Sequence, residues 1–320
     1  MSLTIAYTIC TASHLGQAKT MADSLVAHNP AYKVVIGLVD KISEKTDTAF
    51  FHPHEILPVE ELHLPAFAEM KEKYTLLGLT CALKSYYGSF LLEQYAPGKL
   101  IYIDTDIFVF DSFDYIDASL DTCSIIISPH IRAPYPDDNK RPAENVILNV
   151  GNFNGGFFAM RNDDNARAFL NWWKQRMKDK CYEDPGEGLF DDQLWLNFVP
   201  LYFENVLVLN HDGYNVAYWN LHEKNIEKKG DKYSVNQDFT LAFFHFSGYS
   251  VERPGVLARH QNRYDLADFP VIAELFQKYH NSLIQNRHKE FLLIKCFYRK
   301  RSATKLLFKK VSFNLMYRDH

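Results

Sequence analysis

Two aspartates interrupt an apolar run about a third of the way along the chain, and their type and spacing suit metal chemistry. The run is LIYIDTDIFVF, residues 100–110, and the carboxylates are Asp104 and Asp106. Such a run predicts a strand buried on both faces, where an unpaired carboxylate is costly, so we expect both aspartates at the end of the strand, beside a cleft. Side chains two residues apart in a strand share a side, and paired carboxylates suit Mg²⁺ or Mn²⁺. The alternative is that the two aspartates cap a turn.

Two later stretches offer further groups for such a site. Residues 241–250 predict a buried strand that releases His245 at its end, either as a third metal ligand or as a core histidine. Asn154 precedes Gly155 and Gly156 ahead of another predicted strand. These glycines would let the backbone approach a ligand, and the amide offers both a donor and an acceptor; a simple turn is the alternative.

Charged residues on two predicted helices are candidates for the chemistry itself. Asp192 and Gln193 open a predicted helix, where an acid either caps the helix or stabilises a cation. Lys84 is the only basic residue within the predicted helix of residues 76–95. It is either solvated or directed at a phosphate.

These groups need a framework, and the sequence predicts an α/β one. Residues 3–9 form an apolar strand, residues 10–16 a loop of small side chains, and residues 17–28 an amphipathic helix. This order is typical of a nucleotide-binding unit, although the loop residues also suit ordinary helix capping. The sequence also predicts strands at residues 32–39 and 124–128 and a helix at residues 165–180. Between and after these, it predicts a connector at residues 111–120, a long functional loop at residues 129–148, and an exposed hairpin or loop at residues 224–237.

The composition places the protein among globular proteins of a reducing compartment. The 320 residues are 47% hydrophobic, enough for one large domain or a domain with an appendage. Five scattered cysteines without a Cys-x-x-Cys argue against a disulfide framework and structural zinc. No signal sequence and no run of about 18 apolar residues is visible, so we expect a cytoplasmic protein, or one peripheral at the inner face of the membrane.

The end of the chain differs in charge from the rest. The whole chain has a net charge of −4, which gives no sign of nucleic-acid binding, but residues 287–320 hold ten Lys/Arg against two acids. Their mixture with apolar clusters is typical of a helical segment on an anionic membrane surface. The alternative is a helical appendage with a solvated basic face.

Four motifs in order resemble the retaining family 8 glycosyltransferases of the GT-A fold, most closely the bacterial lipopolysaccharide galactosyl- and glucosyltransferases. They are Tyr102-Ile-Asp104-Thr-Asp106, Phe153-Asn154-Gly-Gly156, Asp192-Gln193 and His245-Phe-Ser-Gly248. The resemblance covers about residues 1–260. It implies an α/β fold with a mixed, mostly parallel central sheet flanked by helices. Residues 1–260 would form the catalytic domain and residues 261–320 a basic helical segment.

The resemblance also implies roles for individual residues. Asp104, Asp106 and His245 would hold Mn²⁺ (or Mg²⁺), which bridges the diphosphate of a UDP-sugar. The residues implied to contact uracil and ribose are Thr8, Thr11, Ala12 and Ser13, and those implied to lie near the nucleotide are Tyr102, Thr105 and Gly248. Lys84 would face the diphosphate or the sugar. The transferred sugar would be surrounded by Asn154, Asp192 and Gln193. The family usually continues with Lys-Pro-Trp after its His-x-x-Gly, and Arg253 stands here as the replacement for that phosphate-binding lysine.

The predicted function is therefore metal-dependent transfer of a hexose from a UDP-sugar to a glycan or glycolipid acceptor, with retention. A sugar-phosphate nucleotidyltransferase is one alternative, but it needs a glycine- and basic-rich first loop, which Thr11-Ala12-Ser13 is not. A non-catalytic module that binds sugar nucleotides or glycans is the other.

Overall fold

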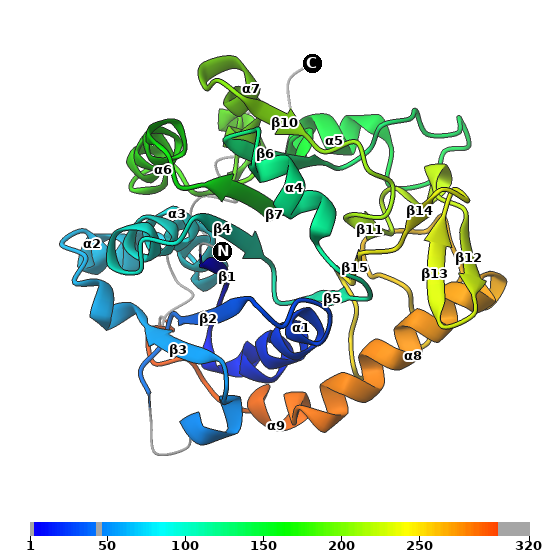
Figure 1. The fold of residues 1–320 in the computed structure, drawn as a ribbon, viewed down its shortest axis with the longest axis horizontal. Coiled ribbons are helices and arrows are strands. Elements are labelled where there is room, and N and C mark those ends of the chain that lie inside the picture. Colours follow the sequence, from blue (N-terminus) through cyan, green and yellow to red (C-terminus); the bar gives the residue numbers. More distant parts are fainter. Residues whose placement is uncertain (1–2, 43–46, 300–320) are drawn as a thin grey trace, which may run out of the picture.

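The computed structural model describes residues 3–42 and 47–299, and they form a layered α/β fold (Figure 1). A seven-stranded sheet has the order β10-β6-β7-β4-β1-β2-β3. Strand β7 runs antiparallel to both of its neighbours, and the other pairs are parallel. The bounds are β1 Thr4–Cys10, β2 Lys33–Leu38, β3 Glu55–Pro58, β4 Lys99–Ile103, β6 Ile125–Pro129, β7 Phe153–Arg161 and β10 Val206–Val208.

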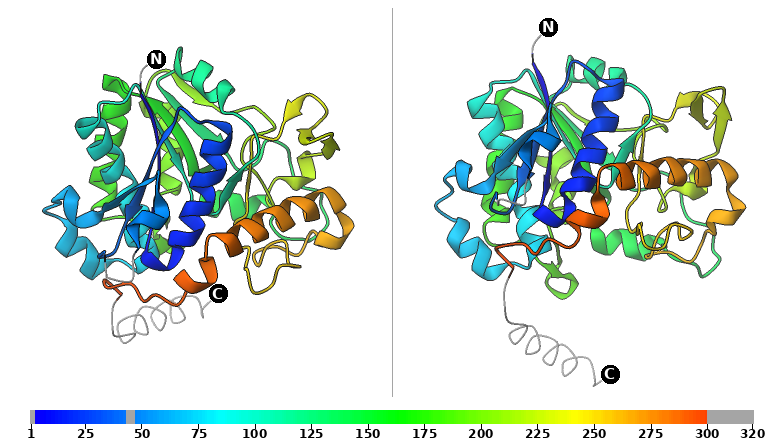
Figure 2. Two further views of the ribbon diagram at one scale, coloured as in Figure 1. Left: turned by 60° about the horizontal axis from the view of Figure 1, so that its bottom comes forward. Right: turned by 90° about the horizontal axis from the view of Figure 1, so that it is seen from below.

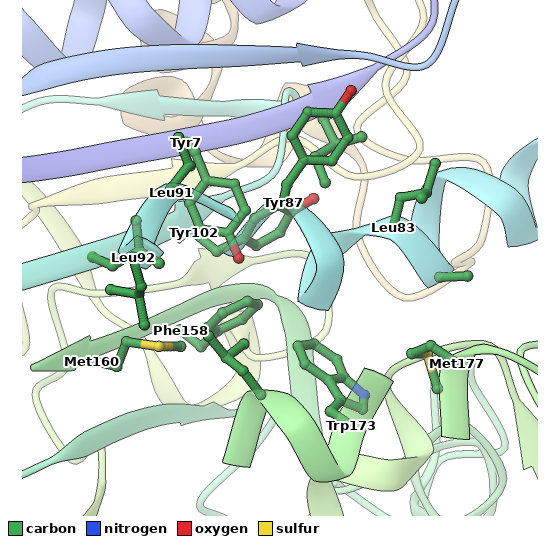
Figure 3. Packing of buried hydrophobic residues seen from close by; sticks show 14 of the residues in the cluster. Tyr7, Leu83, Tyr87, Leu91, Leu92, Tyr102, Phe158, Met160, Trp173 and Met177 are labelled. Carbon is green, nitrogen blue, oxygen red and sulfur yellow. The ribbon is translucent and has the colours of Figure 1, made fainter. Parts of the chain in front are cut away.

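Two helices pack on one face of this sheet, α3 (Leu76–Gln94) and α6 (Asp164–Met177). Alternate side chains of the central strands point to this face, so aromatic residues of β1, β4 and β7 meet there (Figure 3). Tyr102 stacks on Phe158 with ring centroids 4.9 Å apart, and Trp173 of α6 packs edge-on against Phe158 at 5.3 Å. The aromatic core therefore continues from the sheet into α6 and supports α3.

The opposite face is covered by α1 (Leu15–His28) and α4 (Asp114–Leu120). The run of residues 111–120, predicted as a connector, is thus largely helical. Its Ile116 and Leu120 are fully buried, and this apolar spacing of four residues explains the helix.

The central apolar run is broken into two strands that belong to different sheets. Strand β4 ends at Ile103, and β5 (Ile107–Val109) joins a small sheet of order β11-β15-β5 with β15 (Phe243–His245) and β11 (Val216–Ala217). The prediction of one continuous strand was wrong in this respect. The prediction that the two aspartates lie at the end of a buried strand is confirmed, because they occupy the turn between β4 and β5.

Several other predicted boundaries change for local reasons. The glycines after Asn154 lie inside β7, and Asp192 precedes a 3-10 turn, Leu194–Phe198, which runs into the short helix α7 (Val199–Tyr202). The predicted long loop ends in α5 (Glu144–Val150). The predicted hairpin is confirmed as β12 (Ile226–Lys229) and β13 (Lys232–Val235), joined by β14 (Phe239–Thr240). Three further short elements are α2 (Phe67–Lys73), β8 (Glu183–Asp184) and β9 (Leu189–Phe190).

The last described elements return to the start of the chain. Helix α8 (Pro270–Gln285) packs Phe276 and Tyr279 against Phe246, and α9 (His288–Phe291) follows beside the beginning of α1 (Figure 2). Within the two described ranges, no helix combines the length and apolarity needed to cross a bilayer. Most of the predicted membrane-surface segment, residues 300–320, lies outside the described residues.

Candidate active site

A cavity of about 440 Å³ opens where β1 and β4 end, beside the turn that carries the two aspartates. Ligands of open α/β sheets commonly bind at this edge. The walls come from the first loop, from α3, from the β4–β5 turn and from the segment after β15. They include Thr11, Ser13, His14, Gln17, Leu77, Thr80, Cys81, Lys84, Tyr102, Asp104, Thr105, Asp106, Gly248, Tyr249 and Arg259.

Asp104 and Asp106 line this cavity, and His245, which is buried and not among the lining residues, meets them there. Each offers a ligand atom, and these atoms all lie within 4.8 Å of one another. The pairing of β15 with β5 places His245 opposite Ile107, and the amide of Phe246 donates to the carbonyl of Asp106 (2.7 Å). His245 Nε2 lies 3.0 Å from Asp106 Oδ1. Burial opposes ionisation of Asp106, but the neighbouring His245 holds the pKa of that carboxyl below its usual range.

Gly156 leaves the space in which these groups converge. A Cβ at this position would lie 2.5 Å from His245 Cε1 and 2.7 Å from Asp104 Oδ2, closer than real Cβ contacts. The carbonyl of Gly156 accepts from the amide of Asp104 (2.8 Å), so the strand holds the turn at this point. Gly156 is therefore required because His245 and Asp104 leave no space for a Cβ, and not because the chain turns there.

We expect Gly156→Ala to displace His245 and Asp104 and to weaken Mn²⁺ binding by about 10- to 100-fold, the effect typical of disturbing the groups around a metal site. Electron paramagnetic resonance of free Mn²⁺ during a titration measures this. Gly255→Ala is the control, because a Cβ there would meet no atom within 4 Å. Equal Mn²⁺ affinity of wild type and Gly156→Ala would contradict the account.

Lys84 lies behind the aspartates and is almost fully buried. Its Nζ lies 3.0 Å from Asp192 Oδ2 and 3.4 Å from Asp104 Oδ1, and it donates to the carbonyl of Gly155 (2.9 Å). Burial alone would lower the pKa of Lys84, but the two carboxylates raise it, so the ammonium stays charged. Of the two interpretations from sequence, the solvated lysine is wrong.

Asn154, Asp192 and Gln193 form a group beside Lys84. Gln193 Oε1 accepts from Asn154 Nδ2 (3.2 Å) and from the amide of Gly155 (2.9 Å). Asp192 is buried, and burial raises its pKa although Lys84 acts in the opposite direction. The structure thus brings together all four predicted catalytic side chains, and among them Lys84 lines the cavity.

The predicted nucleotide contacts divide into two sets. Tyr102, Thr105, Gly248, Thr11 and Ser13 line the cavity. His14 lines it too; it belongs to the predicted loop of residues 10–16 but was not among the predicted contacts. Thr8 in β1 and Ala12 in that loop are buried and are not among the lining residues.

Arg253 is exposed and is not among the residues of the cavity wall, so its predicted contact with phosphate has no support in the structure. Successive turns at residues 250–256 direct the chain away from the cavity, and the amide of Arg259 then donates to the carbonyl of Gly248 (3.2 Å). This brings Arg259 into the cavity wall. Gly248 has φ +77°, a conformation that favours glycine.

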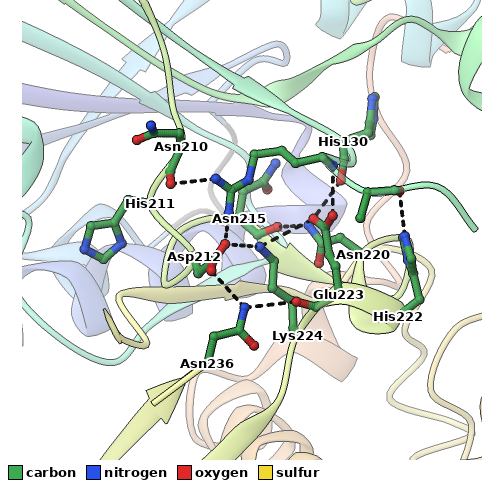
Figure 4. Close-up of polar contacts among 12 residues, drawn as sticks. His130, Asn210, His211, Asp212, Asn215, Asn220, His222, Glu223, Lys224 and Asn236 are labelled. Carbon is green, nitrogen blue, oxygen red and sulfur yellow. Dashed lines mark hydrogen bonds and ion pairs between the residues drawn. The ribbon is translucent and has the colours of Figure 1, made fainter. Parts of the chain in front are cut away.

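The segment after β6, predicted as a functional loop, is held against the region that carries residues 210–236 (Figure 4). Arg132 pairs with Asp212, donates to the carbonyl of Asn210 (2.6 Å), and its amide donates to Glu223 (2.9 Å). Lys224 Nζ lies 2.6 Å from the same oxygen of Asp212, Oδ1. The pair between exposed Arg132 and largely buried Asp212 therefore holds the segment against residues 210–236.

His130 connects this segment to Asn154. Its Nδ1 donates to the carbonyl of Gly151 (2.8 Å), and its Nε2 lies 3.3 Å from Asn154 Nδ2, so the neutral ring satisfies both contacts. Burial lowers the pKa of His130 to about 4 from 6.5.

We expect the stability that depends on neutral His130 to be complete above pH 6.5 and to decrease as the pH falls toward 4, because the unfolded chain binds the proton more readily. At pH 5 the loss amounts to about 2 kcal/mol. Urea unfolding at pH 7 and pH 5 measures it, and His130→Gln should lose correspondingly less between these pH values. Parallel losses in the two proteins would contradict this assignment.

No family model matches the chain. It is 29% identical over 189 residues to the uncharacterized protein YfnF of Bacillus subtilis (strain 168), across 59% of this chain and 61% of that protein. It is 23% identical over 252 residues to the uncharacterized protein YfnD of the same organism, across 76% of this chain and 77% of that protein. The chain thus spans about three fifths of the first relative.

Among solved structures, the fold is similar to that of the galactosyltransferase LgtC in complex with donor and acceptor sugar analogs. The TM-score is 0.52 at 15% identity, over 88% of this chain and 96% of that chain. The bifunctional glycosyltransferase WbbM in its apo form gives a TM-score of 0.50 at 13% identity, over 91% of this chain and 51% of that chain. The chain therefore has the GT-A glycosyltransferase fold that the resemblance to family 8 implied.

Proposed function

We propose that this protein is a metal-dependent glycosyltransferase that moves a hexose from a UDP-sugar to a glycan or glycolipid acceptor with retention. The observation that carries the proposal is the convergence of buried His245 and buried Lys84 on Asp104 and Asp106, the two carboxylates of the cavity wall. The fold supports the reaction type, because the solved structures that share it are glycosyltransferases.

The residues present fit a divalent cation. Asp104, Asp106 and Asp192 carry three negative charges and Lys84 one positive charge, so the cluster has a net charge of −2 when His245 is neutral. Two carboxylates and an imidazole favour Mn²⁺, whereas Mg²⁺ prefers oxygen ligands alone. When bound, the cation would supply positive charge to the diphosphate leaving group.

Lys84 would supply further positive charge on the same side. Three acceptors hold its ammonium in place before substrate arrives, and such preorganisation stabilises charge that develops during a reaction. Asp192, Gln193 and Asn154 would lie around the transferred sugar, which gains positive character as its bond to UDP breaks. With retention, the acceptor hydroxyl attacks from the face that UDP leaves, and an oxygen of the departing phosphate accepts its proton. The chain then needs no separate base.

The first loop would hold the nucleoside. Thr11, Ser13 and His14 form one wall of the cavity, and Thr8 and Ala12 would support them from behind. We assign the basic contact with the diphosphate to Arg259 in place of Arg253, because Arg259 lines the cavity beside Gly248.

The basic end of the chain would bring the enzyme to a glycolipid acceptor at the cytoplasmic face of a membrane. Leu293 and Phe297 are exposed by 83% and 65%, and Lys295 lies between them in sequence. Apolar side chains interspersed with basic ones favour an anionic surface. We keep residues 1–260 as the proposed catalytic domain and residues 261–320 as the appendage, and we propose no nucleic-acid partner.

A thermal-shift screen of nucleotide sugars, with and without Mn²⁺, tests the donor class. A bound ligand stabilises the protein by an amount set by its affinity, so we expect UDP-hexoses to raise the melting temperature only with Mn²⁺. No shift with any nucleotide sugar would overturn the proposal. A shift with UTP and a hexose 1-phosphate, and none with UDP-hexoses, would favour a nucleotidyltransferase.

A further inference from the structure

Asn215 is a buried residue whose side chain contacts the ring nitrogen of His245 that faces away from the aspartates. Its Oδ1 lies 3.2 Å from His245 Nδ1, while His245 Nε2 lies 3.0 Å from Asp106 Oδ1. We propose that Asn215 is a positioning residue that keeps the proton of His245 on Nδ1 and leaves the lone pair of Nε2 for the divalent cation. This inference rests on the metal site of the proposed function.

The chemistry of the contact sets the tautomer. An amide oxygen can only accept a hydrogen bond, and a neutral imidazole carries a single N–H. With the single proton of the neutral ring on Nδ1 and donated to Asn215, Nε2 carries none, so a cation can take the place of the contact between Nε2 and Asp106 Oδ1. A partner on the far nitrogen of a metal-binding histidine fixes both its tautomer and the orientation of its ring.

The amide of Asn215 serves this contact in particular. Asn215 is 1% exposed, and its Nδ2 has no hydrogen-bond partner among the described residues. If the amide were turned over, Nδ2 would face Nδ1 and favour the tautomer with the proton on Nε2, which cannot bind a cation there. The orientation of this one side chain thus decides whether His245 can be a ligand.

The backbone around Asn215 is built to hold it. Asn215 has φ +52° and lies directly before β11, whose Ala217 pairs with His245 in parallel register. Asn220 closes the turn: its Nδ2 donates to the carbonyl of Asn215 (2.9 Å) and its Oδ1 accepts from the amide of Ala217 (2.9 Å). Asn220 Nδ2 also donates to the carbonyl of His130 (3.2 Å), and Figure 4 shows these residues. Trp219 packs edge-on against the His245 ring, with centroids 5.0 Å apart.

Two substitutions distinguish the effect of the hydrogen bond between Asn215 and His245 from the effect of the backbone conformation at position 215. Asn215→Gly removes the acceptor and suits positive φ, and Asn215→Asp keeps an acceptor oxygen at the same place. Asn236→Gly is the matched control, because Asn236 has φ +50° and its Nδ2 donates to Asp212 and to the carbonyl of Glu223, away from His245.

The experiment is a titration of each full-length protein with Mn²⁺ alone at neutral pH, read by electron paramagnetic resonance, beside its melting temperature. We expect Asn215→Gly to bind Mn²⁺ about 10- to 100-fold more weakly than wild type. Asn215→Asp and Asn236→Gly should bind Mn²⁺ within a few-fold of wild type. In ¹⁵N-histidine-labelled wild type loaded with Mg²⁺, the proton of His245 should be on Nδ1.

The possible results distinguish a failure of the role proposed for Asn215 from a failure of the proposed metal site. Equal Mn²⁺ affinity of wild type and Asn215→Gly, or a His245 proton on Nε2, would overturn the role of Asn215 and leave the metal site standing. An equal loss in Asn236→Gly would show that the effect comes from general destabilisation and would also overturn it. No Mn²⁺ binding by the wild type would overturn the proposed metal site itself.

Discussion

Replacing Asp106 with asparagine is expected to slow Mn²⁺-dependent release of UDP from a UDP-hexose by about 10³-fold or more, comparable to the larger losses seen when one preorganised electrostatic group is removed. The variant loses one charged ligand and the negative partner of His245 Nε2 (3.0 Å). The net charge of the cluster changes from −2 to −1, so Mn²⁺ binding should weaken as well. The measurement is initial rates of UDP release over a range of Mn²⁺ concentrations.

Asp111→Asn is the control for this experiment. Asp111 follows β5 closely, but its carboxylate pairs with exposed Lys232 at 3.0 Å and is not among the groups that line the cavity. We expect its turnover to remain near that of wild type. Undiminished turnover in Asp106→Asn at low Mn²⁺ would contradict the assignment of Asp106 as a ligand.

Replacing Lys84 with methionine is expected to reduce both stability and turnover. Removing one partner of a buried ion pair typically costs about 3–5 kcal/mol, because the remaining charge is left without compensation. Here Asp192, which is 3% exposed, would lose its ammonium partner at 3.0 Å, and Asp104 would lose one at 3.4 Å. Urea unfolding measures the free energy, and UDP release measures the turnover.

A second substitution separates these two effects. In Lys84→Met/Asp192→Asn the uncompensated buried charge is removed, so we expect most of the stability to return while turnover stays low. Lys73→Met is the control, because Lys73 pairs with the exposed side chains of Glu69 and Asp179 on the surface, and such pairs contribute at most about 1 kcal/mol. Recovery of turnover in the double variant would show that Lys84 has no part in the reaction.

The elements that depend on local sequence were predictable. The strand, loop and helix at the start of the chain and the long helix α3 follow from apolar periodicity. Thr75 caps the start of α3, because its side chain accepts from the amide of Gly78 (3.0 Å). The break between β4 and β5 was not predictable in the same way. It depends on the pairing of β5 with β15, whose residues come more than 130 positions later in the chain.

The residues of the candidate site also differ in whether the local sequence indicated them. Motifs of adjacent residues indicated Asp104, Asp106 and His245, because each stands at the end of an apolar run. Arg259 and Asn215 carry no such signal, since turns at residues 248–259 and the register of β11 bring them to the site. From the sequence of its helix, the side chain of Lys84 could face either solvent or a phosphate. Its ion pairs with Asp104 and Asp192, which are distant in sequence, direct it to the interior.

The most direct test of the central claim is release of free UDP when the full-length protein is incubated with UDP-glucose or UDP-galactose, with Mn²⁺ or with a chelator. We predict release that requires Mn²⁺ and the Asp106 carboxylate, and that accelerates when a glycan or glycolipid acceptor is present. Binding of the UDP-hexose without any release of UDP would contradict catalysis, and equal release with the chelator would contradict the role of the cation.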